Sequence, residues 1–267
     1  MFFPALVSSN RKDFRTHLVY ADLLARQSAG LSASCSLTPL LEKDKLKNIE
    51  SKTKLIELTK KSIDDELEIV KTVGEYSRAS ILWLPIKTYY LVYHQLCIID
   101  YILTGETASL TMLHKNCVPL FSKRLLDKVL TFSNPLFNVV CNKSILNFKT
   151  VSGELLRLSP SDRRTYGLIM KKVVKDKISN KKIIEGLDER NKDDKAKVEK
   201  FRNSLSVSIF DFFYLMRLRL NYRNSDFIDD ILARDTKIYF QRYHKASDNF
   251  YRCLHDLKND LITRIPS

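Results

Sequence analysis

The sequence predicts an all-α protein, and three observations support this prediction. Only six glycines and seven prolines occur in 267 residues, whereas proteins built from many short strands need these residues in their turns. Apolar residues recur at intervals of three, four or seven over several long segments, as on the buried faces of helices. One apolar stretch, residues 81–103, carries apolar side chains on almost every side of a helical projection.

The first third of the chain contains two predicted helices joined by a linker. A first helix is predicted over residues 11–27, and the small residues at 28–39 end it. A longer amphipathic helix follows over residues 41–76, with a break near Ser51 and lysines on its outer face. A stripe of this kind is typical of a core helix, and less often forms a coiled-coil seam with a partner.

The stretch at 81–103 is predicted to be the central helix of the fold. Membrane insertion is the alternative for so long an apolar run. Four polar side chains spread through the run oppose it, because each would cost several kcal/mol in lipid: Lys87, His94, Gln95 and Asp100. Pro85 sits near the predicted start, and Gly105 supplies a left-handed C-terminal cap.

The middle of the chain is less regular. A helix is predicted over residues 112–132, followed by a poorly periodic segment at 133–160 with a short β-like run at 139–141. Ser161 then caps a helix over residues 161–178.

Residues 171–200 hold the densest charge in the chain, with lysines and acidic residues interleaved. This mixture favours a solvated loop and helix surface over the alternative, an arm that binds nucleic acid.

Two strongly apolar helices are predicted at the C-terminal end. The first covers residues 198–222 and is apolar enough to pack against the central helix. The second covers residues 236–262, and its predicted inward side chains are Ile238, Phe240, Tyr243, Phe250, Leu254, Leu257 and Leu261.

The net charge of +14 indicates a polyanionic partner, with nucleic acid first and an acidic protein or anionic lipid next. The alternative is that this charge serves solubility alone. Five widely spaced cysteines form no metal-binding or CxxC pattern, so free thiols in a reducing, cytoplasmic environment are expected. No phosphate loop, nucleophile motif or histidine pair occurs, and we expect neither a cofactor nor a metal.

Several short motifs resemble those of HEPN domains. They are YYLVYH at 89–94, TG at 104–105, HK at 114–115 and FYLMRLRLNY at 213–222. The family's second helix commonly reads YYxxFHA, a glycine-containing link and an HK pair follow, and a tyrosine and an arginine precede a DY- or NY-like pair later on. The resemblance covers about half of the chain.

The resemblance implies a four- or five-helix bundle that forms homodimers. Residues 51–267 would be this bundle, residues 1–50 an N-terminal helical extension, and about 133–197 a charged insertion. Many members of the family are RNA-cleaving toxins or antiviral defence proteins, and others are non-catalytic partners of nucleotidyltransferases.

The family's ribonucleases carry an Arg-x(4–6)-His motif in the late helix, and the resemblance transfers it to Arg219, Arg223 and Asn224. Arg223-Asn224 matches the opening pair of the motif, but no histidine follows at the required spacing. In another register, Arg219 is followed five residues later by Asn224. Asparagine does not shuttle protons as imidazole does. The candidates for contacts with nucleic acid are Arg217, Tyr222, His114 and Lys115.

Structural roles are the alternatives for these side chains. The late arginines could pair with carboxylates nearby in the sequence, Asp211, Asp226 or Asp229. His94 is expected in the core or an interface, and Tyr89, Tyr90 and Tyr93 are expected to pack rather than stack on bases.

Two functions follow from these observations. The first is a nucleic-acid-binding protein of a prokaryotic defence or toxin–antitoxin type, with metal-independent ribonuclease activity from altered catalytic residues as its enzymatic form. The second is a non-catalytic homodimeric module whose basic surface binds an acidic protein, such as an antitoxin.

Overall fold

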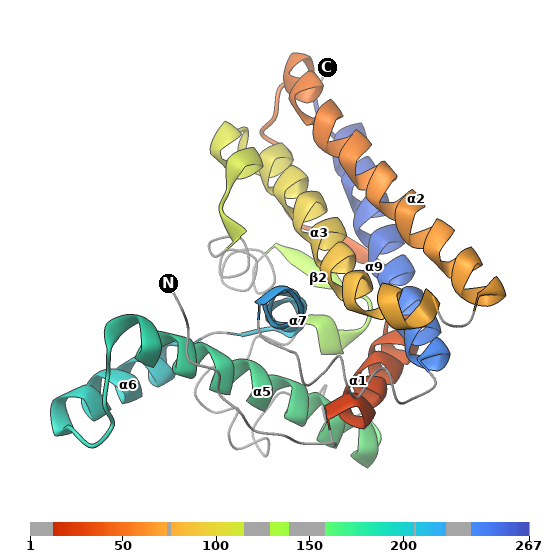
Figure 1. Cartoon of the computed structure of the whole chain (residues 1–267). Coiled ribbons are helices and arrows are strands. Elements are labelled where there is room, and N and C mark those ends of the chain that lie inside the picture. Colours follow the sequence, from red (N-terminus) through yellow and green to blue (C-terminus); the bar gives the residue numbers. More distant parts are fainter. Residues whose placement is uncertain are drawn as a thin grey trace.

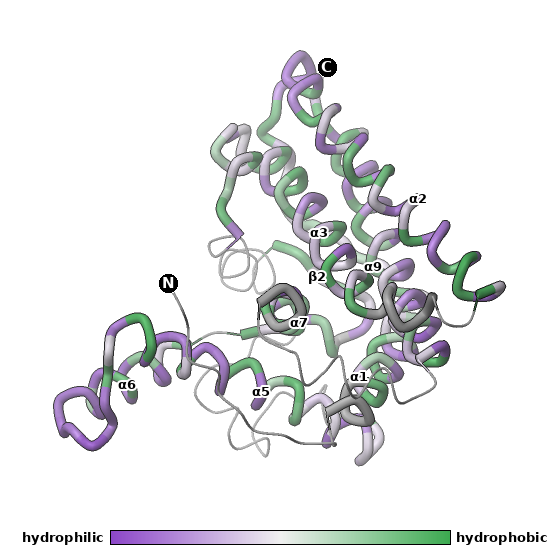
Figure 2. The backbone as a smooth tube through the Cα atoms, in the orientation of Figure 1, coloured by the Kyte–Doolittle hydropathy of each residue, from purple (hydrophilic) through white to green (hydrophobic). Residues whose placement is uncertain are grey.

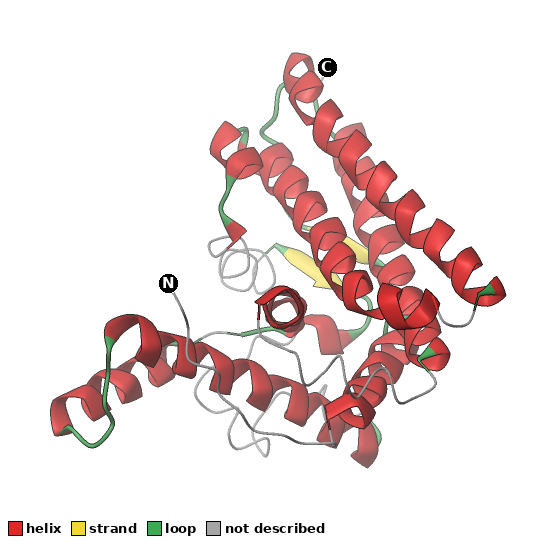
Figure 3. Ribbon diagram, in the orientation of Figure 1, coloured by secondary structure: helices red, strands yellow, loops and turns green. Residues whose placement is uncertain are grey.

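The computed structural model describes residues 13–73, 76–114, 129–138, 158–205, 207–222 and 236–266 (Figure 1). Within these ranges the chain is mostly helical, and one small two-stranded sheet accompanies the helices (Figure 3). The prediction of an all-α protein is therefore confirmed at the level of fold class.

The helix α3, Tyr76–Thr104, lies at the centre of the molecule. It packs against α2 (Glu50–Thr72), α7 (Ile209–Tyr222) and α9 (Lys237–Thr263), and α2, α3 and α9 lie side by side (Figure 1). The predicted central helix is confirmed, although it begins five residues earlier, so that Pro85 lies inside it. Among the described residues, none of the helices is long and apolar enough to cross a membrane.

Gly105 ends α3 as predicted. Its φ of 71° lies in the left-handed region, which a residue without a Cβ adopts without steric cost. The Gly105 N–H donates a hydrogen bond of 2.7 Å to the Tyr101 carbonyl, which satisfies a carbonyl left free at the helix end.

The N-terminal helix α1, Asp13–Gln27, packs against α9 and against α5, Pro160–Glu185. The 3₁₀ helix η1, Lys43–Ile49, leads directly into α2. The change from 3₁₀ to α-helix at Glu50 corresponds to the break predicted near Ser51.

Two short strands occur within segments for which the sequence predicted a linker and a helix, and residues 115–128 of that helix lie outside the described residues. The linker contains β1, Ala33–Cys35, which pairs antiparallel with β2, Leu130–Phe132. The predicted helix over 112–132 is therefore wrong at its C-terminal end, because β2 satisfies its backbone groups by pairing with a distant segment. Leu130 and Phe132 are buried while Thr131 is exposed, an alternation too short to recognise in the sequence. The predicted β-like run at 139–141 lies outside the described residues.

The densely charged residues 171–200 lie in a helical hairpin, two helices joined by a short link. Pro160 occupies the first turn of α5, and Ser159, not Ser161, caps this helix by accepting a hydrogen bond from the Asp162 N–H. Gly186 closes α5 with a left-handed φ of 62°, and α6, Lys192–Ser204, runs back along it. The end of this hairpin projects from the rest of the molecule (Figure 1).

The predicted helix over 198–222 is two helices, α6 and α7. Leu205 adopts an extended conformation after α6, and Asp211 accepts hydrogen bonds from the backbone N–H and hydroxyl of Ser208. These bonds define a new helix start. The terminal helix α9 agrees with its prediction, except that Ile238 is 48% exposed rather than inward.

Apolar residues gather where α3, α7 and α9 meet, while hydrophilic residues dominate the projecting hairpin (Figure 2). Aromatic rings from distant parts of the chain meet in this core. Phe250 of α9 contacts Phe210 and Phe213 of α7 and Phe137, which belongs to the 3₁₀ helix η4, Pro135–Asn138. This core holds α7 against α3, and thereby positions the site described next.

Candidate functional site

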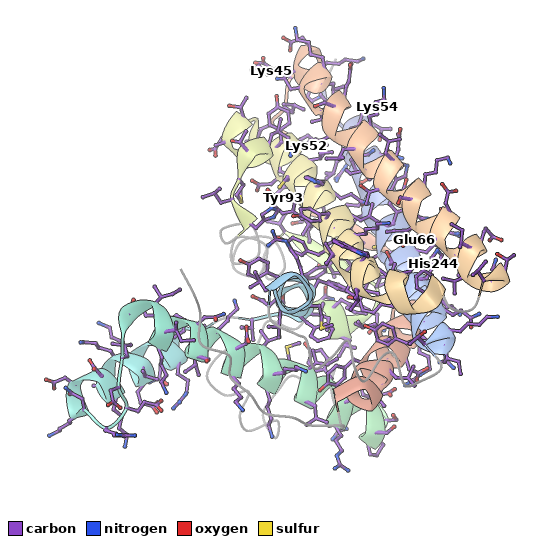
Figure 4. All side chains as sticks on the ribbon, in the orientation of Figure 1. Lys45, Lys52, Lys54, Glu66, Tyr93 and His244 are labelled. Atoms are coloured by element: carbon purple, nitrogen blue, oxygen red, sulfur yellow. The ribbon has the colours of Figure 1, made fainter. Side chains whose placement is uncertain are left out.

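Aromatic and cationic side chains from α2, α3, α7 and the segment after α3 converge on one side of α3. We call this group the tyrosine–histidine cluster, and its members are Lys52, Tyr89, Tyr90, Tyr93, His94, His114, Tyr214 and Arg217. Lys52 comes from α2 and Tyr93 from α3 (Figure 4).

The helical repeat of α3 places four of these rings in two adjacent rows. Tyr89 and Tyr93 are one turn apart, and their rings stack with centroids 5.8 Å apart. Tyr90 and His94 repeat this spacing, with centroids 5.9 Å apart. Side chains at positions i and i+4 of a helix lie above one another, so the YYLVYH sequence itself generates both rows.

His114 completes the cluster from the segment that follows the 3₁₀ helix η2, Thr107–Thr111. Its ring centroid lies 4.3 Å from that of Tyr93 and 5.4 Å from that of Tyr90. Its Nδ1 shares a hydrogen bond of 3.0 Å with the Tyr89 hydroxyl, and the Tyr93 hydroxyl donates to the Met112 carbonyl. These bonds from α3 hold the segment around His114 in place.

Arg217 reaches the cluster from α7. Its guanidinium carbon lies 5.5 Å from the centre of the Tyr89 ring and 5.4 Å from that of Tyr90, within the range of cation–π attraction. One Nη donates to the Tyr90 hydroxyl at 3.2 Å. The buried Nε has no hydrogen-bond partner among the described residues. Tyr214, one turn before Arg217, packs on Tyr89 with ring centroids 5.6 Å apart.

Lys52 lies beside His94 and, together with burial, favours its neutral form. The Lys52 Nζ lies 3.5 Å from the His94 Nδ1, a long hydrogen bond. Because an ammonium group only donates, Nδ1 must accept, so His94 is neutral and carries its proton on Nε2. Burial and the charges of Lys52 and His114 lower the pKa of His94 to about 4. His94 therefore offers an N–H donor at neutral pH.

The electrostatic field at the cluster is positive. The pKa of His114 is lowered by burial, and next by the charges of Arg217 and Lys52. The groups whose charge lowers the pKa of His94 or of His114 are thus cations or the other histidine. An anion at this position would relieve the repulsion and accept hydrogen bonds from these donors.

The structure brings together two of the residues named from the sequence, His114 and Arg217, through their shared contacts with Tyr89 and Tyr90. Arg219 and Tyr222 lie in α7, but their side chains are not described. Lys115, Arg223 and Asn224 lie outside the described residues.

One side-chain role differs from the sequence expectation. Arg217 binds Tyr90 instead of Asp211, whose carboxylate pairs with Lys177 of α5. The three tyrosines of α3 pack as expected: Tyr89 and Tyr93 are 2% and 6% exposed, and half-buried Tyr90 packs against the same core.

Sequence reasoning missed Lys52 and Tyr214, and it assigned no electrostatic role to His94. The repeated i, i+4 spacing of Tyr89–Tyr93 and Tyr90–His94 is a signal that could have marked one face of α3. Lys52 gave no signal, because 42 residues separate it from His94 and only the packing of α2 on α3 joins them.

A separate cavity of about 200 Å³ lies at the C-terminal end of α3. Its described lining includes no lysine or arginine side chain. Its polar lining includes Asp100, which accepts a hydrogen bond of 2.6 Å from Ser109. Its lining residues are Leu37, Leu40, Asp100, Leu103, Thr104, Glu106 and Val129. The carboxylates make it a poor site for an anion.

In the part of the chain that the structure describes, no group of three or more His, Cys, Asp or Glu side chains could hold a metal ion. The described cysteines, Cys35, Cys97 and Cys253, are buried free thiols. No protein-family model, curated protein or solved structure matches this chain.

Proposed function

We propose that this protein binds RNA, and that the tyrosine–histidine cluster holds one of the RNA phosphates. The observation that carries this proposal is the convergence of Lys52, Arg217 and two histidines at a place where cations perturb both imidazoles. The net charge of +14 supports the same class of partner. The HEPN resemblance agrees with it, and suggests a prokaryotic defence or toxin–antitoxin setting.

The donors of the cluster suit a phosphate group. The Nε–H of Arg217 has no hydrogen-bond partner among the described residues, and a guanidinium fork can bind two phosphate oxygens at once. Lys52 supplies a second full charge, and neutral His94 adds a donor at Nε2. The buried rings of Tyr89 and Tyr93 fix the positions of these groups, and half-buried Tyr90 is the tyrosine available to a base.

RNA binding is tested with a labelled single-stranded RNA and measured over a range of salt concentrations. We expect Arg217→Gln and Lys52→Gln each to weaken binding, and each to reduce the slope of log K against log salt by about 0.7. Arg217→Lys keeps the positive charge, so its slope of log K against log salt should remain close to that of the wild type. Lys61→Gln is the matched control, because Lys61 is exposed on the same helix as Lys52 and pairs with Asp65. Equal losses in Lys61→Gln and Lys52→Gln would reject the cluster as the site.

Metal-independent cleavage of the bound RNA is the second candidate function. Arg217, whose charge acts on His114, belongs to the same helix as Arg219. We propose Arg219, Arg223 and Asn224 as the residues that act on the RNA. Cleavage in the presence of a chelator should be lost in Arg219→Ala and Arg223→Ala, and cleavage that survives both substitutions would reject this assignment.

We also propose that the protein forms a homodimer, and that an acidic protein is the alternative partner. Both proposals can be tested on the protein sample used for RNA binding. Light scattering at micromolar concentration should give the mass of a dimer, and a monomer would reject a site shared between two copies. A dimer that ignores RNA at low salt would instead favour the non-catalytic module, whose partner is an acidic antitoxin or a nucleotidyltransferase.

A further inference from the structure

Some exposed cations on the surface helices are paired with a neighbouring carboxylate, whereas others, such as Lys192, Lys195 and Lys200 of α6, have no such partner among the described residues. Lys61 and Lys71 of α2 pair with Asp65 and Glu68, and Lys197 of α6 pairs with Asp194. The charges of such a pair neutralise one another, so these paired lysines contribute little net field to a partner.

The outer face of α5 carries cations without such pairs. We call the three exposed cations Arg164, Lys171 and Lys175 the α5 basic row. None of the three has an ion-pair or hydrogen-bond partner among the described residues, although α5 contains several acidic side chains. The free cations of this helix are therefore concentrated in one row.

Helical geometry places the α5 basic row on a single line. At about 100° per residue, Lys171 and Lys175 each lie within about 20° of Arg164 around the helix axis. Tyr166, Ile169 and Val173 lie about 140–200° away, and these three are buried in the core. The row thus faces directly away from the body of the protein.

The acidic side chains of α5 lie off this line or are already bound. Asp162 is held by Arg26 of α1 and by Gln27, and Glu185 pairs with Lys181. Asp176 lies about 120° from Arg164 and accepts a hydrogen bond from Asn180. An approaching polyanion consequently meets cations without adjacent carboxylates.

We propose that the α5 basic row is a second contact surface for RNA, one that binds the sugar–phosphate backbone without reading its sequence. The inference rests on the proposed function for the identity of the polyanion, but it concerns a different surface from the tyrosine–histidine cluster. The row rises about 16 Å along the helix axis, at about 1.5 Å per residue. Regularly spaced cations on a rigid helix suit a strand whose charges repeat regularly, because such a strand can bind in any register.

The composition of this face favours nucleic acid over an acidic protein. Protein interfaces need a buried apolar core, and nucleic-acid interfaces are more polar and more positively charged. Leu168, which is 46% exposed, is the one large apolar side chain within this row. The exposed pair Ile183 and Ile184 projects elsewhere, about 100–200° from Arg164.

The test compares two triple variants with the same change of net charge. One is Arg164→Gln, Lys171→Gln and Lys175→Gln, and the matched control is Lys61→Gln, Lys71→Gln and Lys197→Gln, whose lysines are exposed but paired. The probes are labelled single-stranded RNAs of two unrelated sequences, with polyglutamate as a competitor. Circular dichroism verifies that both variants remain helical.

We expect the α5 variant to bind both RNAs about tenfold more weakly at moderate salt, with a salt slope reduced by about two, and the control to change by about twofold or less. Equal losses in the two variants would reject the row, because net charge alone would then explain binding. Polyglutamate that displaces RNA from the row at matched charge concentration would also reject it, in favour of an acidic protein partner. If the α5 variant binds like the wild type while Arg217→Gln does not, the row fails and the proposed function stands. If the wild type binds no RNA, both fail.

Discussion

His94 lies on α3 one turn after Tyr90, half-buried and next to the ammonium group of Lys52. Burial removes water from the imidazolium form, and the neighbouring cation repels it, so both effects favour neutral imidazole. A histidine in this state cannot pair with a carboxylate through charge, but it can donate one N–H to an anion. The protonation state of His94 is therefore set by its burial and by the charge of Lys52, and not by the ordinary pKa of a histidine.

A titration of the histidine ring protons by NMR tests this state. We expect His94 to titrate near pH 4 in the wild type, and Lys52→Met to raise its pKa while leaving it below 6.5, because burial remains the larger cause. The unfolded chain binds more protons at this residue than the folded chain between about pH 4 and 6.5. Stability should therefore fall as the pH is lowered through this window, and more gently in Lys52→Met. His94 titrating at its ordinary value in the wild type would contradict this account.

At the scale of elements, the start of α7 depends on one carboxylate. The Asp211 side chain is fully buried; it accepts a hydrogen bond of 2.7 Å from the Ser208 N–H and pairs with Lys177 of α5. It thus caps its own helix and binds that helix to its neighbour. Because α7 carries Arg217, this carboxylate also helps to position the tyrosine–histidine cluster.

Asp211→Asn should reduce the free energy of unfolding by about 2–4 kcal/mol, because Lys177 loses its partner in a partly buried position. Urea denaturation followed by circular dichroism measures this loss. Asp65→Asn is the control, because Asp65 pairs with Lys61 on the exposed surface, and we expect a change of about 0.5 kcal/mol or less. Similar effects of the two substitutions would show that the buried pair is not important for stability.

At the scale of the whole molecule, hydrogen bonds join segments that are far apart in the sequence. The guanidinium of Arg26 in α1 donates two hydrogen bonds, of 3.1 and 2.8 Å, to Asp162 at the start of α5. Gln27 also donates to Asp162, and Asn134 donates to the Gln27 carbonyl. The segment predicted to be an N-terminal extension therefore contacts both the bundle and the charged segment.

Removal of residues 1–50 tests how independent this segment is. The leucine and isoleucine side chains in it that are 5% exposed or less are Leu23, Leu24, Leu41 and Ile49. At about 2 kcal/mol each, their burial contributes on the order of 8 kcal/mol, which is comparable with the whole stability of a domain. We expect residues 51–267 alone to lack a cooperative unfolding transition in urea. A sharp transition would instead support the predicted division between an extension and a bundle.

The helices with strong local patterns could be predicted from the sequence. The apolar positions of α9 repeat at helical intervals, and its ends were predicted to within one residue. Gly105 marks the end of α3 as predicted. The apolar repeat of α2 was also recognised, but this helix begins at Glu50, after η1, instead of at Leu41. The strands β1 and β2 could not be predicted, because three residues are too few for a pattern and each strand exists only by pairing with the other. The break between α6 and α7 was missed because the apolar pattern appeared to continue through Leu205.

Part of the candidate site could also be predicted. His114 and Arg217 were named from short motifs, but 103 positions separate them in the sequence and only the packing of α7 on α3 brings them together. Lys52 was not named, because its role depends on its distance from His94.

The sequence by itself determined the helical class, the long buried centre and the basic character of the protein, because composition and periodicity act over neighbouring residues and need no knowledge of distant contacts. The tertiary structure alone decided which charges are neutralised and which are free. It paired Asp211 with Lys177, set Lys52 beside His94, and left the α5 basic row facing outward. The physical reason is that charge and hydrogen-bond interactions act over a few ångströms of space, whatever the separation along the chain.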